Sequence, residues 1–267
     1  MSEGGNAAVQ ETFYTLAGCP LRIALVADLH ERPYGEVLAS LRKNRPALIC
    51  VAGDFLYGSL PESGRRLRGS GMLPFFLACA ELAPCFVSLG NHEWLLRPEE
   101  LALLGQTGAT VLDDAFVRRR IGGAELVIGG LSSARCVACR SLCAAGLTME
   151  EATAQTPSRA LTTPPRLAWL DGFCAAPGYR ILLCHHPEYY PRYLRGRDID
   201  LILSGHAHGG QIRLLGQGLF APGQGVLPRL TAGVKDGRLV ISRGLANFQR
   251  VPRLFNPTEL VYLLPRP

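Results

Sequence analysis

The sequence predicts a layered α/β protein with either one mixed β-sheet or two packed β-sheets. Two observations support this class. Short apolar runs alternate with helical patterns in the first half of the chain, whereas strand-like runs follow one another more directly in the second half. The 267 residues are 48% hydrophobic and 19% charged, which allows a large core and excludes a disordered or fibrous chain.

The first half of the chain predicts three buried strands, each followed by a helix. The strands are near-continuous apolar runs at 21–27, 47–52 and 85–89. The helices are predicted at 35–43, 73–82 and 98–106. Pro98 suits the first turn of the third helix, because a proline there removes no helical hydrogen bond. Shorter strands are predicted near Thr110, at 116–121 and at 125–128.

The second half predicts further strands and two helices. The strands are placed at 179–184, 199–203, 211–215, 238–242 and 259–264, and the helices at 166–173 and 187–194. The chain shows no internal repeat and no Ser/Gly-rich linker, so residues 1–267 are expected to form a single domain. The segment at about 132–163 is the least regular part, and we expect it to be a lid or insertion.

Three cysteines lie in that segment: Cys136, Cys139 and Cys143. Their spacings of three and four place the thiols on one face of a helix. A zinc or iron–sulfur site needs about four ligands. We therefore interpret these cysteines as small buried residues of a lid helix.

Bulk features indicate a cytoplasmic protein without a transmembrane segment. The longest apolar stretch, 71–89, is interrupted by Pro74, Glu81 and Pro84. The first ten residues lack the basic and apolar regions of a secretory signal. The nine cysteines are an odd number and several lie in apolar runs, which is typical of buried thiols in a reducing compartment. Peripheral contact with a membrane is compatible with this interpretation.

The formal net charge of +6 does not by itself predict a nucleic-acid partner. The basic residues form short patches at 65–68, 118–120 and 192–197. These patches lack the interleaved aromatic residues of a single-strand binding platform. We expect solvated surface patches and no specific binding of nucleic acid.

Polar clusters follow five separate strand-like runs, and together they hold all six histidines. The clusters are Asp28-Leu29-His30, Gly53-Asp54, Gly90-Asn91-His92-Glu93, His185-His186-Pro187 and Gly205-His206-Ala207-His208. Because ligands of α/β sheets bind beyond the carboxyl ends of the strands, we expect the clusters to meet at one edge. Each Asp or Asn taken singly is typical of a turn or helix cap, so the prediction depends on all five clusters occurring together.

Taken together, the side chains of the five clusters predict a metal centre. Carboxylate oxygens, an amide oxygen and imidazole nitrogens suit Mn, Fe, Zn and related divalent ions. No cysteine joins the clusters, which disfavours a thiolate zinc site. Seven or eight donors exceed the needs of one tetrahedral ion, and they fit two ions bridged by one carboxylate.

In this order, the five clusters resemble the motifs of the calcineurin-like metallophosphoesterases: D-x-H, G-D, G-N-H-[DE], a His after a strand, and G-H-x-H. The run 206–211 and the later segments 242–245 and 257–259 are similar to a bacterial phosphodiesterase branch of that family. The resemblance implies a four-layer α-β-β-α sandwich of two mixed β-sheets flanked by helices. It also implies two divalent metal ions, Mn, Fe or Zn, with Mn as the first expectation.

The resemblance further implies a role for each matched residue. The expected ligands are Asp28, His30 and His208 for the first metal, Asn91, His185 and His206 for the second metal, and Asp54 as the bridge. His92 is expected to stay off the metals and to protonate or stabilise the leaving alkoxide, while a metal-bridging hydroxide attacks phosphorus in line.

Two neighbours of these residues are interpreted separately. His185 is preferred over His186 as a ligand because it directly follows the strand-like run 181–184, and His186 receives no role. Glu93 is expected to brace its loop rather than to act chemically.

The expected function is metal-dependent hydrolysis of phosphate esters, with diesters preferred over monoesters. A protein Ser/Thr phosphatase or other phosphomonoesterase is the alternative, although Gly53-Asp54 is followed by Phe-Leu-Tyr-Gly rather than by Asp-Arg-Gly. A catalytically inactive binding scaffold is a further alternative, disfavoured because every ligand position is filled. Lipid-linked phosphodiesters, nucleotides and cyclic nucleotides are all compatible substrates. No substrate-binding residue is identified, and specificity is expected in the segments 58–71 and 132–163.

Overall fold

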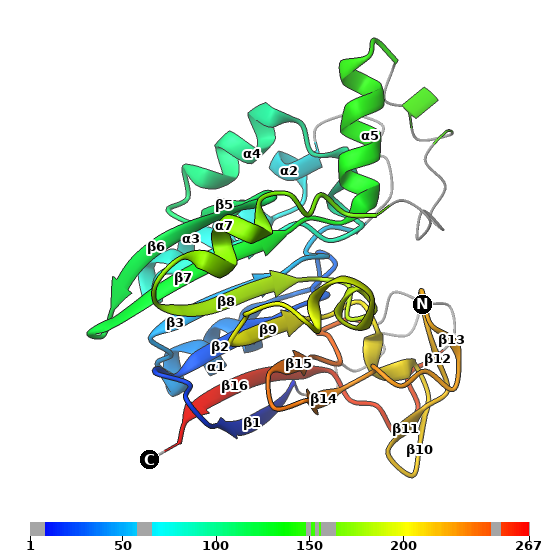
Figure 1. The fold of residues 1–267 in the computed structure, drawn as a ribbon. Helices are drawn as coiled ribbons and strands as arrows, with labels where there is room; N and C mark the ends of the chain where they lie inside the picture. Colours follow the sequence, from blue (N-terminus) through cyan, green and yellow to red (C-terminus); the bar gives the residue numbers. More distant parts are fainter. Residues whose placement is uncertain are drawn as a thin grey trace.

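Two six-stranded β-sheets pack face to face in the computed structural model of the chain, and helices cover their outer faces (Figure 1). The structure describes residues 9–57, 66–147, 151–152, 155, 164–246 and 252–266. Both sheets are mixed, with parallel strands in the middle and antiparallel pairs toward an edge. The predicted class, two mixed sheets flanked by helices, is confirmed.

The first sheet joins the beginning of the chain to its end. Its strand order is β1-β16-β2-β3-β4-β5, in which β2 to β5 are parallel and β16 runs antiparallel to β2. The strands are β1 (Gln10–Leu16), β2 (Ile23–Val26), β3 (Leu48–Ala52), β4 (Cys85–Ser88), β5 (Thr110–Leu112) and β16 (Glu259–Pro265). The helices between its parallel strands are α1 (Gly35–Asn44), α2 (Arg66–Gly69), α3 (Met72–Leu82) and α4 (Pro98–Gly105).

The second sheet has the order β14-β15-β9-β8-β7-β6. Its strands are β6 (Ala115–Ile121), β7 (Ala124–Leu131), β8 (Tyr179–Cys184), β9 (Leu201–Ser204), β14 (Gly233–Lys235) and β15 (Leu239–Ile241). The helical elements that accompany it are α5 (Ala134–Ala144), α7 (Leu170–Ala175) and the wide turn η2 (Tyr190–Leu194). Two small hairpins follow β9: β10 (Arg213–Leu214) with β11 (Gln217–Gly218), and β12 (Phe220–Ala221) with β13 (Gly225–Val226).

Apolar side chains alternate along the central strands and so build three buried layers. Ile23 and Leu25 of β2 point into the layer between the sheets, whereas Ala24 and Val26 face the helices of the first sheet. On the second sheet, Leu182 of β8 points outward and packs in the layer that includes α7. Because both faces of these strands are buried, their sequences are continuous apolar runs.

The sequence missed two of the four edge strands, β1 and β14. Both are only partly buried, so they lack the apolar runs that mark the central strands. The helix predicted at 166–173 begins only at Leu170, because the chain after Pro164-Pro165 first runs without helical hydrogen bonds and then turns. The helix predicted at 187–194 is shorter than expected and is limited to η2.

Part of the predicted lid or insertion at 132–163 forms the helix α5, at the upper right of Figure 1. In this helix Cys136 is buried and Cys143 is half-buried. The side chain of Cys139 and most of 148–163 lie outside the described residues, as does the stretch 58–65 of the predicted specificity loop.

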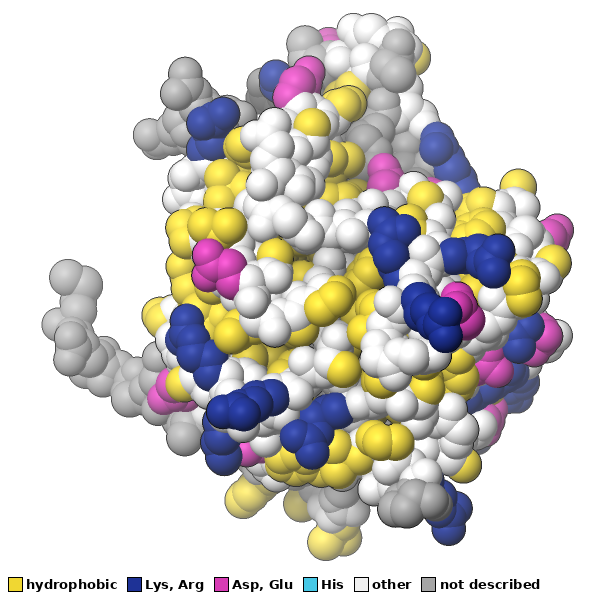
Figure 2. Space-filling model, turned by 90° about the vertical axis from the view of Figure 1, so that its left-hand side faces the viewer, with side chains coloured by type: hydrophobic (Ala, Val, Ile, Leu, Met, Phe, Trp, Pro, Cys, Tyr) yellow, Lys and Arg dark blue, Asp and Glu magenta, His cyan; other side chains and the backbone are white. Residues whose placement is uncertain are grey.

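The parallel strands of both sheets end at the same edge, on the right of Figure 1. Figure 2 shows the opposite face, where Lys and Arg side chains are spread among apolar and acidic ones and no histidine is visible. Within the described ranges, no helix has both the length and the apolar character that crossing a bilayer requires.

Candidate metal centre

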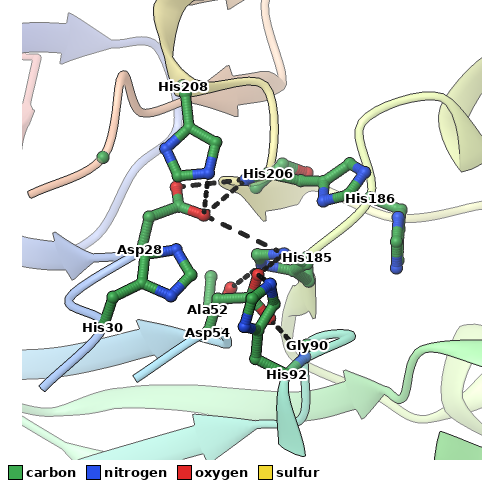
Figure 3. Close-up of polar contacts among 12 residues, drawn as sticks. Asp28, His30, Ala52, Asp54, Gly90, His92, His185, His186, His206 and His208 are labelled. Carbon is green, nitrogen blue, oxygen red and sulfur yellow. Dashed lines mark hydrogen bonds and ion pairs between the residues drawn. The ribbon is translucent and has the colours of Figure 1, made fainter. Parts of the chain in front are cut away.

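Side chains from five strand ends meet at the carboxyl edge of the two sheets (Figure 3). The residues that follow β2, β3, β4, β8 and β9 there are Asp28 and His30, then Asp54, Asn91 and His92, and finally His185, His206 and His208. All are buried except Asn91, which is half-buried. The sequence predicted each of these eight residues as part of the site, and the fold places all eight at this one edge.

A first cluster consists of Asp28, His30 and His208, whose side chains each offer one ligand atom within 4.8 Å of the others. Asp28 Oδ1 lies 3.8 Å from His208 Nε2. The His30 ring is oriented by a hydrogen bond of 3.0 Å between its Nδ1 and the carbonyl of Leu56. The Asp28 carboxylate also accepts the backbone N–H of His206, which ties the two sheets together at this point.

A second cluster consists of Asp54, His185 and His206, with ligand atoms equally close. His185 Nε2 lies 3.1 Å from Asp54 Oδ2 and 3.9 Å from Asp28 Oδ1, so it faces both carboxylates. Its Nδ1 is 2.7 Å from the carbonyl of Ala52, which fixes the ring. Asp54 also forms a group with His30 and His92, and it therefore lies between the two clusters.

Asn91 and His92 complete the site from the loop after β4. His92 donates its backbone N–H to Asp54 Oδ1 at 2.8 Å, and its ring Nε2 lies 3.7 Å from Asp54 Oδ2. The side-chain oxygen of Asn91 is buried, and within the described residues it has no hydrogen-bond partner. His92 is thus close to the carboxylate between the clusters.

The backbone at the site is held in a sparsely populated conformation. Asp28, His30, Asp54, His206 and His208 all have φ between 46° and 65°, in the left-handed region. Such a residue costs roughly 1–3 kcal/mol unless the surrounding fold enforces it. Five such residues at one edge are typical of a functional site, where geometry is maintained at the expense of stability.

Glycines allow the loops to approach the carboxylates closely. A Cβ at Gly244, where φ is +78°, would lie 2.7 Å from Asp28 Oδ2. A Cβ at Gly90 would collide with Asp54 Oδ1. Neither position tolerates a larger residue without displacing a site carboxylate.

Burial and charge shift the titration of the clustered side chains in opposite directions. Burial raises the pKa of Asp28, with repulsion from Asp54 adding to the shift. Burial also acts to raise the pKa of Asp54, but His185, His92 and His30 outweigh it and hold that pKa well below its ordinary value. Burial lowers the pKa of His30 to about 3. Burial also lowers the pKa values of His206 and His208, so these rings stay neutral, as metal ligands must be. At His185 burial acts in the same direction, but the Asp54 and Asp28 carboxylates outweigh it and raise the pKa to about 10.

Glu93 is buried and braces the loops behind the site. Its carboxylate accepts the backbone N–H groups of Asp54, Leu56 and Gly90 at 2.9, 3.0 and 2.7 Å. Burial raises its pKa to about 8, and the nearby Asp54 contributes to the shift. These contacts agree with the bracing role expected from the sequence.

His186 belongs to a separate hydrogen-bonded chain next to the second cluster. Its Nε2 is 2.8 Å from Ser133 Oγ, and its Nδ1 is 3.1 Å from Glu188 Oε1. The same Glu188 oxygen lies 3.6 Å from His206 Nε2. In Figure 3, His186 lies at the far right, farther than His185 from the two Asp carboxylates.

Sequence reasoning missed Ser133 and Glu188. Glu188 follows His185 by three residues, and a carboxylate beside a histidine cluster is a signal that could have been used. Ser133 lies 53 residues before His186, and no local pattern connects the two. His186, Glu188 and His206 also form a group of three close ligand atoms.

The donor set fits divalent cations. It combines carboxylate oxygens, imidazole nitrogens and one amide oxygen, which suits Mn²⁺, Fe²⁺ or Zn²⁺. The buried Asn91 Oδ1 and His208 Nδ1 have no hydrogen-bond partner among the described residues, and a bound cation would satisfy such atoms.

Known proteins are similar to this chain over most of its length. A family model described as calcineurin-like phosphoesterase matches residues 21–210. The uncharacterized protein YpbG of Bacillus subtilis (strain 168) is 26% identical over 227 residues, which cover 84% of this chain and 73% of the relative. Phosphodiesterase YaeI of Escherichia coli (strain K12) is 27% identical over 228 residues, which cover 79% of this chain and 69% of the relative.

Solved structures give more distant matches. Phosphopantetheinyl hydrolase from Mycobacterium tuberculosis matches with a TM-score of 0.47 and 13% identity, covering 98% of both chains. The NAD nucleotidase of Haemophilus influenzae matches with a TM-score of 0.45 and 21% identity, covering 70% of this chain and 38% of that chain. This chain thus spans about two fifths of the nucleotidase's length.

Proposed function

This chain belongs to the calcineurin-like phosphoesterase family, and we propose that it hydrolyses phosphodiesters at a centre of two divalent metal ions. The observation that carries the proposal is the position of Asp54, whose carboxylate lies between the first and second clusters. A carboxylate in that position is suited to bridge two ions, which typically lie about 3.5–4 Å apart in such centres.

We assign the ligands according to the two clusters. One ion would be held by Asp28, His30 and His208. The other ion would be held by Asn91, His185 and His206, and Asp54 would contact both ions. Two divalent ions carry four positive charges, and Asp28 and Asp54 return two negative ones. The remaining positive charge favours a phosphate ester in the site. Mn is our first choice of metal, with Fe and Zn as alternatives, because such donor sets accept all three.

The bound ions would lower the pKa of a water molecule and stabilise negative charge on the phosphoryl group. The chain's own residues orient the reaction. The His92 backbone N–H holds Asp54, and the His92 ring Nε2 lies 3.7 Å from Asp54 Oδ2. We propose that His92 gives a proton to the departing alkoxide, which makes it the catalytic residue of the centre.

The preference for diesters is supported by the similarity to phosphodiesterase YaeI. It is tested by comparing turnover of a bis-aryl phosphate with turnover of a mono-aryl phosphate, both with added Mn²⁺. We expect the diester to be hydrolysed faster. A clear advantage for the monoester would contradict the preference, and turnover of a phosphopeptide panel would favour the phosphatase alternative.

Three further expectations belong to the same proposal. Residues 1–267 form one domain, with 132–163 as an insertion that contributes to specificity. Two contacts between the start of α5 and the site support the contribution of 132–163 to specificity. Ser133 contacts His186, and the Cys136 thiol donates to the Gly90 carbonyl at 2.9 Å. The buried thiols of Cys50, Cys79 and Cys184 support a reducing, cytoplasmic location.

A further inference from the structure

Most of the exposed large apolar side chains are gathered in one part of the molecule, which we call the hairpin lobe. It comprises residues 211–230, with the hairpins β10–β11 and β12–β13, and residues 252–255. Ten large apolar side chains are exposed within the described residues, and seven of them belong to the lobe. The seven are Leu214, Leu215, Phe220, Val226, Leu227, Leu254 and Phe255.

The backbone of the lobe brings these side chains close together. Phe220 and Val226 face each other as a strand pair across β12 and β13. Residues 252–255 are joined to the first hairpin by a bridge between Ile212 and Leu254. Leu215 is fully exposed at the tip of that hairpin, and Phe255 is 82% exposed. A soluble surface seldom concentrates apolar side chains in this way without a partner.

The lobe adjoins the first cluster directly. Leu219 donates its backbone N–H to the carbonyl of Gly210, at the end of the 3₁₀ turn η3 (His208–Gly210). Asn256, next to the lobe, donates from its side chain to the His208 carbonyl at 2.7 Å. In Figure 1 the hairpins project at the right, the side to which the parallel strands point. Whatever covers the lobe therefore lies beside the site opening.

The hairpin lobe carries positive charge. It contains Arg213, Arg229 and Arg253, which give it a formal net charge of +3. Arg243 is neutralised by Glu259 at 3.2 Å. Within the described part of the chain, no carboxylate forms an ion pair with Arg213, Arg229 or Arg253. Arg213 and Arg253 donate to backbone carbonyls, whereas Arg229 is exposed. The lobe itself contains no acidic residue.

We propose that the hairpin lobe docks the protein on an anionic membrane surface. Five of the seven exposed side chains are aliphatic, and they suit insertion among acyl chains better than stacking on bases. The exposed Arg229 beside them attracts anionic headgroups, and the partly buried Arg213 and Arg253 add positive charge nearby. The metal centre would then open toward the lipid headgroups. Docking does not depend on the reaction proposed above, since it requires no turnover.

The test measures co-sedimentation of the full chain with vesicles. One set is phosphatidylcholine alone, and the other contains one quarter phosphatidylglycerol. We expect binding to the anionic vesicles that weakens at high salt, and about fivefold weaker binding to the neutral ones. The double variant Leu215→Ser/Phe255→Ser should lose at least about tenfold in partitioning, because it removes two inserting side chains without changing charge.

Leu77→Ser is the matched control, because Leu77 is 50% exposed on α3 but outside the lobe. It should sediment like the wild type. Melting temperatures show that all variants are folded. The proposal is overturned if the wild type stays in the supernatant with both vesicles, or if the double variant sediments as well as the wild type. The wild type could instead self-associate or bind an oligonucleotide while it fails to bind vesicles. If only the double variant abolished that binding, the lobe would have a different occupant, and the proposal would also be overturned.

Discussion

The two clusters of the metal centre differ in the charges that stand next to them. Beside the second cluster is Glu188, whose Oε1 lies 3.6 Å from His206 Nε2. Its charge is maintained because His206 and His186 outweigh the effect of burial and lower its pKa to about 2. Beside the first cluster is the cation Arg253, whose charge opposes the burial that raises the pKa of Asp28.

This difference predicts unequal affinities for the two ions. Two unit charges about 4 Å apart interact by about 1 kcal/mol in water and by about 4 kcal/mol near a protein surface. Interactions of that size change affinity by about fivefold to several hundredfold. We expect the second cluster to hold its ion more tightly, and a chelator to strip the first cluster first.

The largest effect is expected from Asp54→Asn, which removes the charge shared by both clusters. The asparagine oxygen can still accept the His92 backbone N–H, so the loop should keep its shape. We expect both ions to bind weakly and diester turnover to fall by more than about 10³-fold. Turnover and metal content after dialysis are the measurements.

Asp28→Asn is the matched control, because Asp28 belongs to the first cluster only. It should lower the affinity of one ion and leave the other in place. Equal loss of both ions in the two variants would contradict the division into two clusters.

The next effect is expected from His92→Gln, which leaves both clusters intact. We expect diester turnover to fall by about 10²–10⁴-fold, because the leaving alkoxide loses its proton donor. Metal content should stay at the wild-type level. Unchanged turnover would show that His92 is not the proton donor.

A smaller and selective effect is expected from Glu188→Gln. The amide keeps the size of the side chain but removes the charge behind His206, so the second ion should bind about 10-fold more weakly. Mn²⁺ titration followed by turnover measures this, and excess Mn²⁺ should restore the rate. Glu125→Gln, at an exposed Glu on β7, is the matched control. If Glu188→Gln weakened the first ion instead, the charge argument would be wrong.

The smallest effect is expected from Ser133→Ala, which removes one hydrogen bond from His186. The free energy of unfolding should fall by about 0.5–1.5 kcal/mol, measured by denaturant titration. Metal content should not change, because Ser133 contacts no predicted ligand directly. A loss of metal would mean that the hydrogen bonds linking Ser133, His186 and Glu188 position the second cluster.

The sequence was most informative where a structural element buries both of its faces. The run at 47–52 predicts β3 and places Asp54 at its end, because a strand covered on both sides must be apolar throughout. The same logic placed Asp28, His185 and His206 at one sheet edge. The edge strand β1 escaped prediction because its side chains alternate between solvent and core.

The supporting residues around the site were much less predictable. Asp28 is influenced by Arg253, and His186 by Ser133, across separations that only the completed fold closes. The loop conformation was equally difficult to predict. Asp and His are enriched in the left-handed region, but that preference does not single out Asp54 or His206. Sequence patterns thus predicted the residues that meet at this edge, but not the charges that distinguish one cluster from the other.

The central claim is that this chain holds two divalent ions that share Asp54. Its most direct test is a titration of metal-stripped protein with Mn²⁺, followed by electron paramagnetic resonance. We predict two Mn²⁺ per chain, filled in succession, with a spectrum in which the second ion couples magnetically to the first. Binding of a single ion, or of two ions without magnetic coupling, would contradict the account.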